Sequence, residues 1–306
     1  MTPLTASVLQ LAGVALAPLL PGTVQTVKAR LQGRRGASPL QPYRVLRRLW
    51  RKTAVDPQGS GLVYRIAPAV AAASVLLAFA LVPVGGRSGD WALGNDALVL
   101  LGLLALARFA LAAAAWDTGN GFALMGAARD LTLAVFGEAL LALALLVAAL
   151  PAQSTDLVAM AGAASGTGIW EEPAHWCGAL AFAVVVLFET GRQPIDNPDT
   201  HLELTMIHEG PLLEYAGRDL AYLHWTAAGR HWLILTLAAG LFMPHPDGFA
   251  GAVAALAAGV VVACVALALT ETAQAKLRIL RVPALLALGA MVALAGVASW
   301  IAGAGA

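Results

Sequence analysis

Residues 131–151 read LTLAVFGEALLALALLVAALP, an apolar run with one charged side chain, Glu138, and a proline at its end. A transmembrane helix needs about 20 predominantly apolar residues to cross the hydrocarbon core of a bilayer. Leucine and alanine are the residues that a lipid-facing helix requires. This stretch therefore predicts a membrane-spanning helix, and Glu138 is the side chain in it that needs an explanation.

The rest of the chain has the same apolar character. Its 306 residues are 59% hydrophobic and 12% charged, with a mean hydropathy of +0.75, whereas a soluble domain carries about 25% charged residues. We therefore expect an all-α, polytopic membrane protein, with residues 1–306 as a single integral membrane domain. No basic residue precedes the first apolar run, which predicts a span rather than a cleavable signal peptide. About eight transmembrane helices are expected, near 4–22, 62–83, 97–116, 131–151, 174–189, 224–243, 249–270 and 283–303.

The basic residues define a topology on this map. Of the 19 Lys and Arg residues, only Arg87 lies in a loop of the opposite parity, and Arg108 lies inside a span. Cytoplasmic loops are enriched in Lys and Arg. The loops after the first, third, fifth and seventh spans are therefore predicted to be cytoplasmic, with both termini outside. The loop 152–172 agrees, because it carries acidic residues and no Lys or Arg.

The first of these cytoplasmic loops predicts an amphipathic helix. In residues 42–52, Tyr43, Leu46, Leu49 and Trp50 recur at helical spacing, with basic residues on the other side. Such a helix lies at a membrane surface, with its cations facing lipid headgroups or an acidic partner. A simple positive-inside anchor remains an equal interpretation.

Two charges stand out within spans, where insertion costs roughly 2.5–3.5 kcal/mol each. Arg108 and Glu138 lie at similar depths in spans joined by a short loop, so we predict that they face the bundle interior and interact. Burial favours the neutral carboxyl of Glu138, whereas a nearby guanidinium favours the carboxylate. A carboxyl group balanced between these effects can exchange a proton near neutral pH. The alternative is a static ion pair that only orders two helices.

Three more acids lie at predicted span ends. Asp117 and Asp130 bracket the loop after the third span, and Glu271 lies at the end of the seventh. Glu271 can be read as a solvated charge, or as a partner of Lys276 or Arg278.

The densest polar segment runs from 189 to 219 and contains seven of the 18 acidic residues. Asn197 followed by Pro198 predicts the start of a short helix, with Leu202, Met206 and Ile207 packing inward. Glu214 and Arg218 have the i,i+4 spacing of a favourable helical ion pair. A solvated loop is the plain alternative. The seven acids are Glu189, Asp196, Asp199, Glu203, Glu209, Glu214 and Asp219.

The residues that bind metals or form disulfides do not combine into a site. His201, Glu203, His208 and Glu209 lack the HExxH spacing of a zinc helix. Cys177 and Cys264 are far apart, each within an apolar run. We expect no metal, no cofactor and no catalytic residue on this chain, and no nucleic-acid partner.

The pattern Glu189-x-x-Arg192-x-Pro194-x-Asp196-x-Pro198, followed by Glu203-Leu204 and Glu214-Tyr215-Ala216-Gly217, resembles the signature loop of respiratory complex I subunit 1. The stretch DNPDTHLELTMIHE at 196–209 is closer to the homologous subunit of energy-converting group 4 nickel–iron hydrogenases, which include formate hydrogenlyase subunit 4 and hydrogenase-4 components. KARLQGRRG at 28–36, MGAAR at 125–129 and AKLRILRVP at 275–283 extend the resemblance over nearly the whole chain.

The resemblance implies a redox-inactive membrane-anchor subunit in a bacterial or archaeal cytoplasmic membrane. Its implied partners are hydrophilic nickel–iron hydrogenase-like and iron–sulfur subunits, which carry the nickel–iron centre and the clusters, and antiporter-like membrane subunits that translocate protons or sodium. Segment 189–219 becomes a coupling loop beneath the redox arm. The implied coupling residues are Arg108, Asp117, Arg129, Glu138, Glu189, Arg192, Asp196, Glu203, Glu209 and Glu214.

One departure favours the hydrogenase branch. Residues 205–213, between Glu203-Leu204 and Glu214-Tyr215, are more than the quinone-reducing subunits lead us to expect, and they include His208 and Glu209. Two alternatives stay open: the quinone-site subunit of an NADH dehydrogenase, and an independent ion transporter. The transporter interpretation is weakened because no internal repeat is visible.

Overall fold

The computed structural model describes residues 3–89, 91, 94–197, 206–246 and 248–304. Helix is the dominant element of these ranges. The α-helices are α1 Pro3–Leu16, α2 Leu19–Leu31, α3 Gln41–Trp50, α4 Leu62–Leu81, α5 Ala97–Thr118, α6 Gly121–Ala149, α7 Leu157–Ala164, α8 Pro173–Glu189, α9 Gly217–Phe242, α10 Phe249–Ala273 and α11 Val282–Ala304. Short 3-10 helices lie at η1 Thr167–Glu171, η2 Gly210–Leu212 and η3 Ile279–Arg281.

The all-α membrane fold is confirmed. Among the described residues, α4, α5, α6, α10 and the unit Ile279–Gly303 are each long and apolar enough to cross a bilayer, and the bent pair α1–α2 makes a sixth candidate. The two remaining predicted spans are helical as well. α8 is shorter, with 17 residues, and α9 carries several charged and polar residues among its apolar ones.

The segment predicted as a span near 4–22 is a bent pair of helices in the structure. The chain breaks between Leu16 and Leu19, and α1 and α2 meet at an angle of 52°. Pro18 occupies the position before α2, and Pro21 lies in its first turn, where a missing N–H costs nothing. Both prolines are therefore compatible with the start of a second helix that runs in a new direction.

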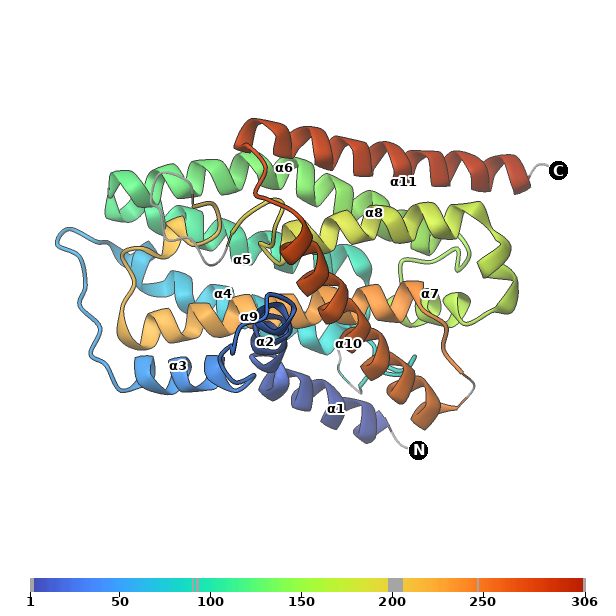
Figure 1. The fold of residues 1–306 in the computed structure, drawn as a ribbon, viewed down its shortest axis with the longest axis horizontal. Coiled ribbons are helices and arrows are strands. Elements are labelled where there is room, and N and C mark those ends of the chain that lie inside the picture. Colours follow the sequence, from blue (N-terminus) through green and yellow to red (C-terminus); the bar gives the residue numbers. More distant parts are fainter. Residues whose placement is uncertain (1–2, 90, 92–93, 198–205, 247, 305–306) are drawn as a thin grey trace.

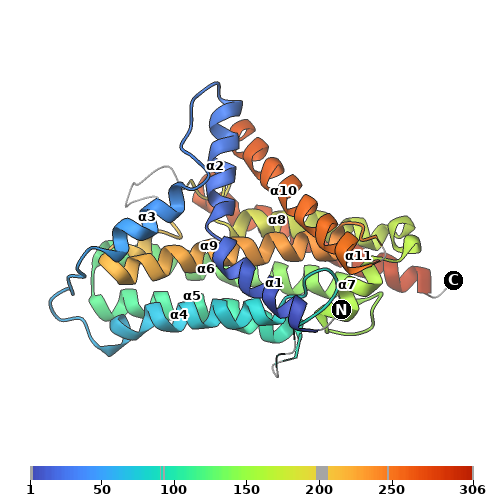
Figure 2. The same cartoon turned by 90° about the horizontal axis from the view of Figure 1, so that it is seen from below.

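Figure 1 shows α4, α5, α6, α8, α9 and α11 running side by side along the long axis of the molecule. α4 packs on α5, and α11 packs on α8 and α6. α2 and α10 leave this bundle together and pack on each other, as Figure 2 shows. This arrangement brings the end of α10 against a helix from the start of the chain.

α6 begins ten residues earlier than predicted. Gly119, in the left-handed conformation with φ 67°, ends α5, and the Asn120 side chain accepts hydrogen bonds from Phe122 and Ala123 N–H to start α6. The prediction placed Arg129 and Asp130 in a loop because they are charged. Both are instead on α6, where Asp130 is buried.

The predicted amphipathic helix is present as α3. It buries none of its residues within this chain, and Arg47 and Arg48 are exposed. Its apolar side is held by two contacts: the Tyr43 hydroxyl donates to the Ala15 carbonyl at 2.7 Å, and Trp50 meets Tyr222 edge-on.

α8 ends near the middle of its neighbours α6 and α9 (Figure 1). Before α9 begins, η2 packs on α6, and backbone atoms meet closely there. A Cβ atom built on Gly126 of α6 would lie 2.6 Å from the Gly210 Cα, so both positions require glycine. This packing places residues 206–212 against the part of α6 that carries Arg129 and Asp130.

Candidate functional site

Arg108, on α5, is the centre of a buried charge cluster. Its side chain is 2% exposed and reaches three carboxylates. One terminal nitrogen lies 2.8 Å from Glu138 Oε1, the other 3.1 Å from Glu189 Oε1, and Nε lies 3.6 Å from Asp130 Oδ2. The predicted contact between Arg108 and Glu138 is therefore present. α5, α6 and α8 each supply one part of the cluster.

A second guanidinium, that of Arg230 on α9, completes the site. Its Nε lies 2.7 Å from Glu189 Oε2, and a terminal nitrogen donates to the Leu104 carbonyl at 2.9 Å. Glu189 is fully buried between the two arginines. Arg230 was not predicted as a site residue. Its position within the apolar run 224–243 was the signal that could have identified it.

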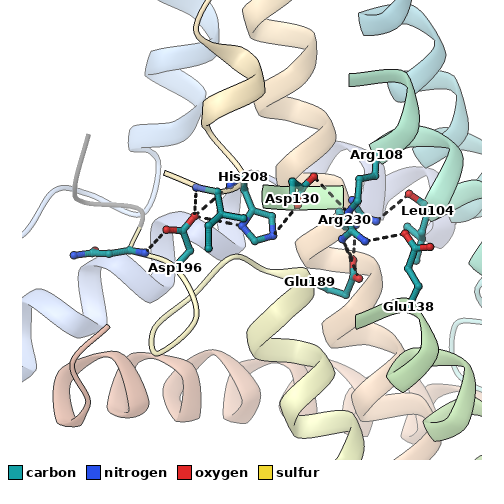
Figure 3. Close-up of polar contacts among 10 residues, drawn as sticks. Leu104, Arg108, Asp130, Glu138, Glu189, Asp196, His208 and Arg230 are labelled. Carbon is teal, nitrogen blue, oxygen red and sulfur yellow. Dashed lines mark hydrogen bonds and ion pairs between the residues drawn. The ribbon is translucent and has the colours of Figure 1, made fainter. Parts of the chain in front are cut away.

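The cluster continues outward to the 189–219 segment through His208. The imidazole Nε2 lies 3.7 Å from Asp130 Oδ1, and Nδ1 lies 3.4 Å from Asp196 Oδ2. Lys276 Nζ lies 2.7 Å from Asp196 Oδ1. Figure 3 shows this series from Asp196 through His208, Asp130 and Arg108 to Glu138 and Glu189. We call it the charge chain: Lys276, Asp196, His208, Asp130, Arg108, Glu138, Glu189 and Arg230.

Asp196 holds the loop end of the charge chain. Burial by itself would raise the pKa of this carboxyl, but the hydrogen bond and charge of His208, followed by those of Lys276, lower the pKa well below its usual range. Asp196 Oδ2 also accepts from the backbone N–H groups of Ile207 and His208. The carboxylate therefore stays charged at neutral pH and ties the segment after α8 to residues 207–208.

A cavity of about 470 Å³ borders the charge chain. On the side of α2 and α3 its lining consists of prolines, glutamines and apolar residues, and on the side of α5, α6 and α9 it includes charged residues. His231 also lines it; this side chain is 3% exposed, and its Nε2 has no hydrogen-bond partner among the described residues. The charged and titratable lining includes Asp130, Glu189, Arg192, His208, Glu209 and Arg230. The cavity gives the buried charges access to water or to a ligand.

Arg192, predicted to belong with the other coupling residues, forms its ion pair elsewhere. It lies 3.1 Å from Glu271 Oε1, and Lys28 Nζ lies 3.2 Å from Glu271 Oε2. The interpretation of Glu271 as a solvated charge is wrong, as is its pairing with Lys276 or Arg278, because its side chain is 0% exposed between two other cations. The packing of α2 on the end of α10 brings this trio together across most of the sequence.

The other predicted coupling residues lie apart from the charge chain. The Arg129 guanidinium reaches the Met206 carbonyl at 3.4 Å. Glu214 contacts Asn120 and precedes α9, so its predicted helical pair with Arg218 is not formed. Glu209 lines the cavity. Glu203 lies outside the described ranges, as does most of the short helix predicted to start at 197–198. Met206 and Ile207 are buried as predicted.

Asp117, also predicted to be a coupling residue, makes contacts of a structural kind. Its Oδ2 accepts from the backbone N–H groups of Gly61 at 2.9 Å and Tyr64 at 2.8 Å. These groups lie at the start of α4, where the first N–H groups of a helix have no partner within the helix. Asp117 therefore caps α4 from the end of α5.

We expect Asp117→Ala to destabilise the folded protein by about 1–2 kcal/mol, as for loss of other helix caps. Thermal unfolding of the purified protein measures this. Asp117→Asn, which keeps an accepting oxygen, serves as the matched variant and should lose less than half as much. If Asp117→Asn is as unstable as Asp117→Ala, the negative charge matters more than the cap.

Within the described residues, no group of three or more His, Cys, Asp or Glu side chains is arranged to hold a metal ion. The fold and the site together define a multi-pass membrane protein in which charged residues lead from a loop into the centre of a helical bundle.

The chain belongs to the NADH dehydrogenase subunit 1 family, whose NADH dehydrogenase profile matches residues 4–302. It is 36% identical to hydrogenase-4 component C of Escherichia coli K12, over 75% of this chain and 71% of that protein. It is 32% identical to formate hydrogenlyase subunit 4 of the same organism, over 87% of this chain and 88% of that one. The family recognised from the segment at 189–217 is thus confirmed.

More distant relatives extend the comparison. A subunit of the NADH-quinone oxidoreductase of Chlorobium luteolum is 27% identical over 65% of this chain and 54% of its own length. The fold is similar to a chain in the structure of the membrane-bound sulfane sulfur reductase, an archaeal respiratory membrane complex. The TM-score is 0.79 at 20% identity, covering 95% of this chain and 98% of that one.

Proposed function

We propose that this chain is the membrane-anchor and coupling subunit of a complex I-like, energy-converting hydrogenase of the formate hydrogenlyase or hydrogenase-4 type. The observation that carries the proposal is the charge chain, which runs without a break from the loop residue Asp196 to Glu138 inside the bundle. The relationship to two hydrogenase-complex proteins supports the assignment. The chain itself is redox-inactive; the nickel–iron centre and iron–sulfur clusters belong to hydrophilic partner subunits.

The proposed mechanism is electrostatic. Charges in a low-dielectric interior interact several times more strongly than in water. A change of charge beneath the redox arm, felt at Asp196 and His208, therefore alters the balance at Asp130 and Arg108. Arg108 divides its contacts among three carboxylates. A shift of its guanidinium toward Asp130 or Glu189 therefore loosens its contact with Glu138. Glu138 then exchanges a proton with the neighbouring membrane subunit.

The proposed placement in the membrane follows the charges. Segment 189–219 and α3 face the cytoplasm, under the hydrophilic subunits, and both termini lie outside. Glu138 is 29% exposed on α6, and its neighbours Val135 and Phe136 are exposed apolar residues. This face of α6 suits an antiporter-like membrane subunit, with lipid covering the remaining apolar faces.

A quinone-reducing complex is the second candidate, and the cavity of about 470 Å³ favours it. That volume lies within the range of small-molecule sites, and apolar residues such as Val45, Leu46 and Val75 line part of it. The extra residues between Leu204 and Glu214 favour the hydrogenase instead.

Affinity purification of the tagged chain from its native membrane in a mild detergent tests the assignment. We expect nickel and iron to co-purify with the chain, together with hydrogen-evolving activity, and an untagged strain to yield neither. Iron without nickel, with quinone reduction, would favour the second candidate. A stably monomeric chain would overturn both and leave the independent transporter.

A further inference from the structure

The loop over α6 is attached by two contacts of different kinds. Gly210 packs against Gly126 through backbone atoms, a contact that no change of charge can alter. Two residues earlier, the His208 imidazole lies between Asp130 of α6 and Asp196 of the preceding segment, as Figure 3 shows. The second contact depends on whether the imidazole carries a proton.

The charge chain contains an unequal number of fixed charges. Its cations are three, Arg108, Arg230 and Lys276, and its carboxylates are four, Asp130, Glu138, Glu189 and Asp196. With a neutral His208 the chain carries one net negative charge, and with an imidazolium it is neutral. An uncompensated charge in a buried site is costly, and a proton on His208 would compensate this one.

The contacts of the two ring nitrogens of His208 give a second argument. An imidazolium donates from both ring nitrogens. His208 Nδ1 and Nε2 each face a carboxylate oxygen, at 3.4 Å and 3.7 Å. A neutral imidazole has one N–H, so one ring nitrogen would direct a lone pair at a carboxylate. Loss of the proton therefore converts one of the two attractions into a repulsion.

We propose that His208 holds an exchangeable proton at the loop end of the charge chain, distinct from the one exchanged at Glu138, and that this proton clasps residues 206–216 to α6. When His208 is protonated, it draws Asp196 and Asp130 together and holds the loop down. When the proton leaves to water in the adjoining cavity, which His208 lines, the loop is held by the glycine contact alone. The attachment of the loop by His208, which we call the clasp, is inferred from these contacts alone. Its role in proton translocation rests on the proposed function.

The groups around His208 come from each neighbouring element. α6 contributes Asp130 and, through the Met206 carbonyl, Arg129. The Phe188 ring of α8 meets the imidazole edge-on. The remaining charged neighbours are Asp196 and Lys276 on one side, Arg108 behind Asp130, Glu189 at the end of α8, and Glu209 next in sequence. The two carboxylates are in direct contact with the ring, whereas Lys276 and Arg108 act through them.

Hydrogen–deuterium exchange of residues 206–216 in the intact purified complex tests the clasp. The Ile207 and His208 amides donate to Asp196 Oδ2 at 3.2 and 3.3 Å, so they report whether Asp196 is held against the loop. Exchange rates, corrected for the intrinsic effect of pH, are measured between about pH 5 and 8, where imidazoles titrate. We expect protection to be high at the acidic end and to fall by about tenfold as pH rises, because loss of one charged hydrogen bond has that effect.

In His208→Gln, the protection of residues 206–216 should be as low at every pH as it is in the unaltered complex at the alkaline end, because glutamine cannot become a cation. His245→Gln is the matched control: His245 lies in the α9–α10 connection beyond Phe242, far along α9 from the loop, and this variant should keep the full pH response. Should His208→Gln fail to assemble, Asp130→Asn keeps the imidazole, removes one of its two carboxylates, and should reduce the response.

Protection that does not change with pH in the unaltered complex would overturn the clasp, as would a full pH response in His208→Gln. Neither result would affect the nickel and iron content that tests the proposed function. Conversely, a complex without nickel would overturn that function and leave the exchange result to stand for the clasp alone.

Discussion

Arg108→Leu is expected to prevent stable assembly of the protein, with a loss of about 3–5 kcal/mol in the free energy of unfolding. That is the cost of removing one partner from a buried ion pair and leaving the other charge uncompensated. Here the cost falls at the high end, because Asp130, Glu138 and Glu189 all lose a cation. Arg230 compensates only part of this loss, through its own contact with Glu189. Denaturant unfolding in detergent measures the loss.

Two further variants separate charge from packing. Arg35→Leu, in the exposed loop between α2 and α3, removes an arginine from the surface and should change the free energy of unfolding by less than about 0.5 kcal/mol. Arg108→Leu combined with Glu138→Leu should recover part of the loss, because one fewer carboxylate is left unpaired. If Arg108→Leu alone unfolds like the parent protein, the cluster does not stabilise the fold as described.

The charges in this cluster differ in how far they could be predicted from the sequence. Arg108 and Glu138 could be paired because each is a lone charge in an apolar run and the two spans are joined by a short loop. Glu189 and Arg230 could not, because nothing in the sequence brings the end of α8 against the middle of α9. The Lys28–Glu271–Arg192 trio was missed for the same reason, since it depends on the bend at Pro18 that directs α2 toward α10.

The helices themselves were largely predictable, because hydropathy alone determines which segments enter a membrane. The errors lie where polar residues are buried within helices. Asp130 looked like a loop residue, yet α6 extends past it because its charge is satisfied by Arg108 and His208. In the sequence, His208 was considered for a metal site and then used to distinguish two branches of the family. Its place between two carboxylates depends on the close Gly126–Gly210 packing, which only the folded chain reveals.

Glu138→Gln is expected to reduce the protons translocated per electron by at least about tenfold, while hydrogen evolution continues. Glu138 is the terminal carboxylate of the charge chain: its ionic contact is with Arg108 at 2.8 Å, whereas Glu189 lies between two arginines. It is also the most exposed carboxylate of the cluster around Arg108, at 29%. Glutamine has nearly the same shape and can still accept from Arg108, but it cannot exchange a proton. The complex should therefore assemble and lose only the transfer.

Inverted membrane vesicles allow both rates to be measured in one sample, with a pH-sensitive dye for acidification and an electrode for hydrogen. Glu171→Gln, an exposed carboxylate in η1 at the opposite end of α8, is the matched control and should leave both rates unchanged. If Glu138→Gln assembles and translocates protons at the parent ratio, the Arg108–Glu138 contact is a static ion pair that orders α5 and α6. The proton would then have to leave the charge chain from another carboxylate, and Asp130, which contacts both His208 and Arg108, would be the next to replace.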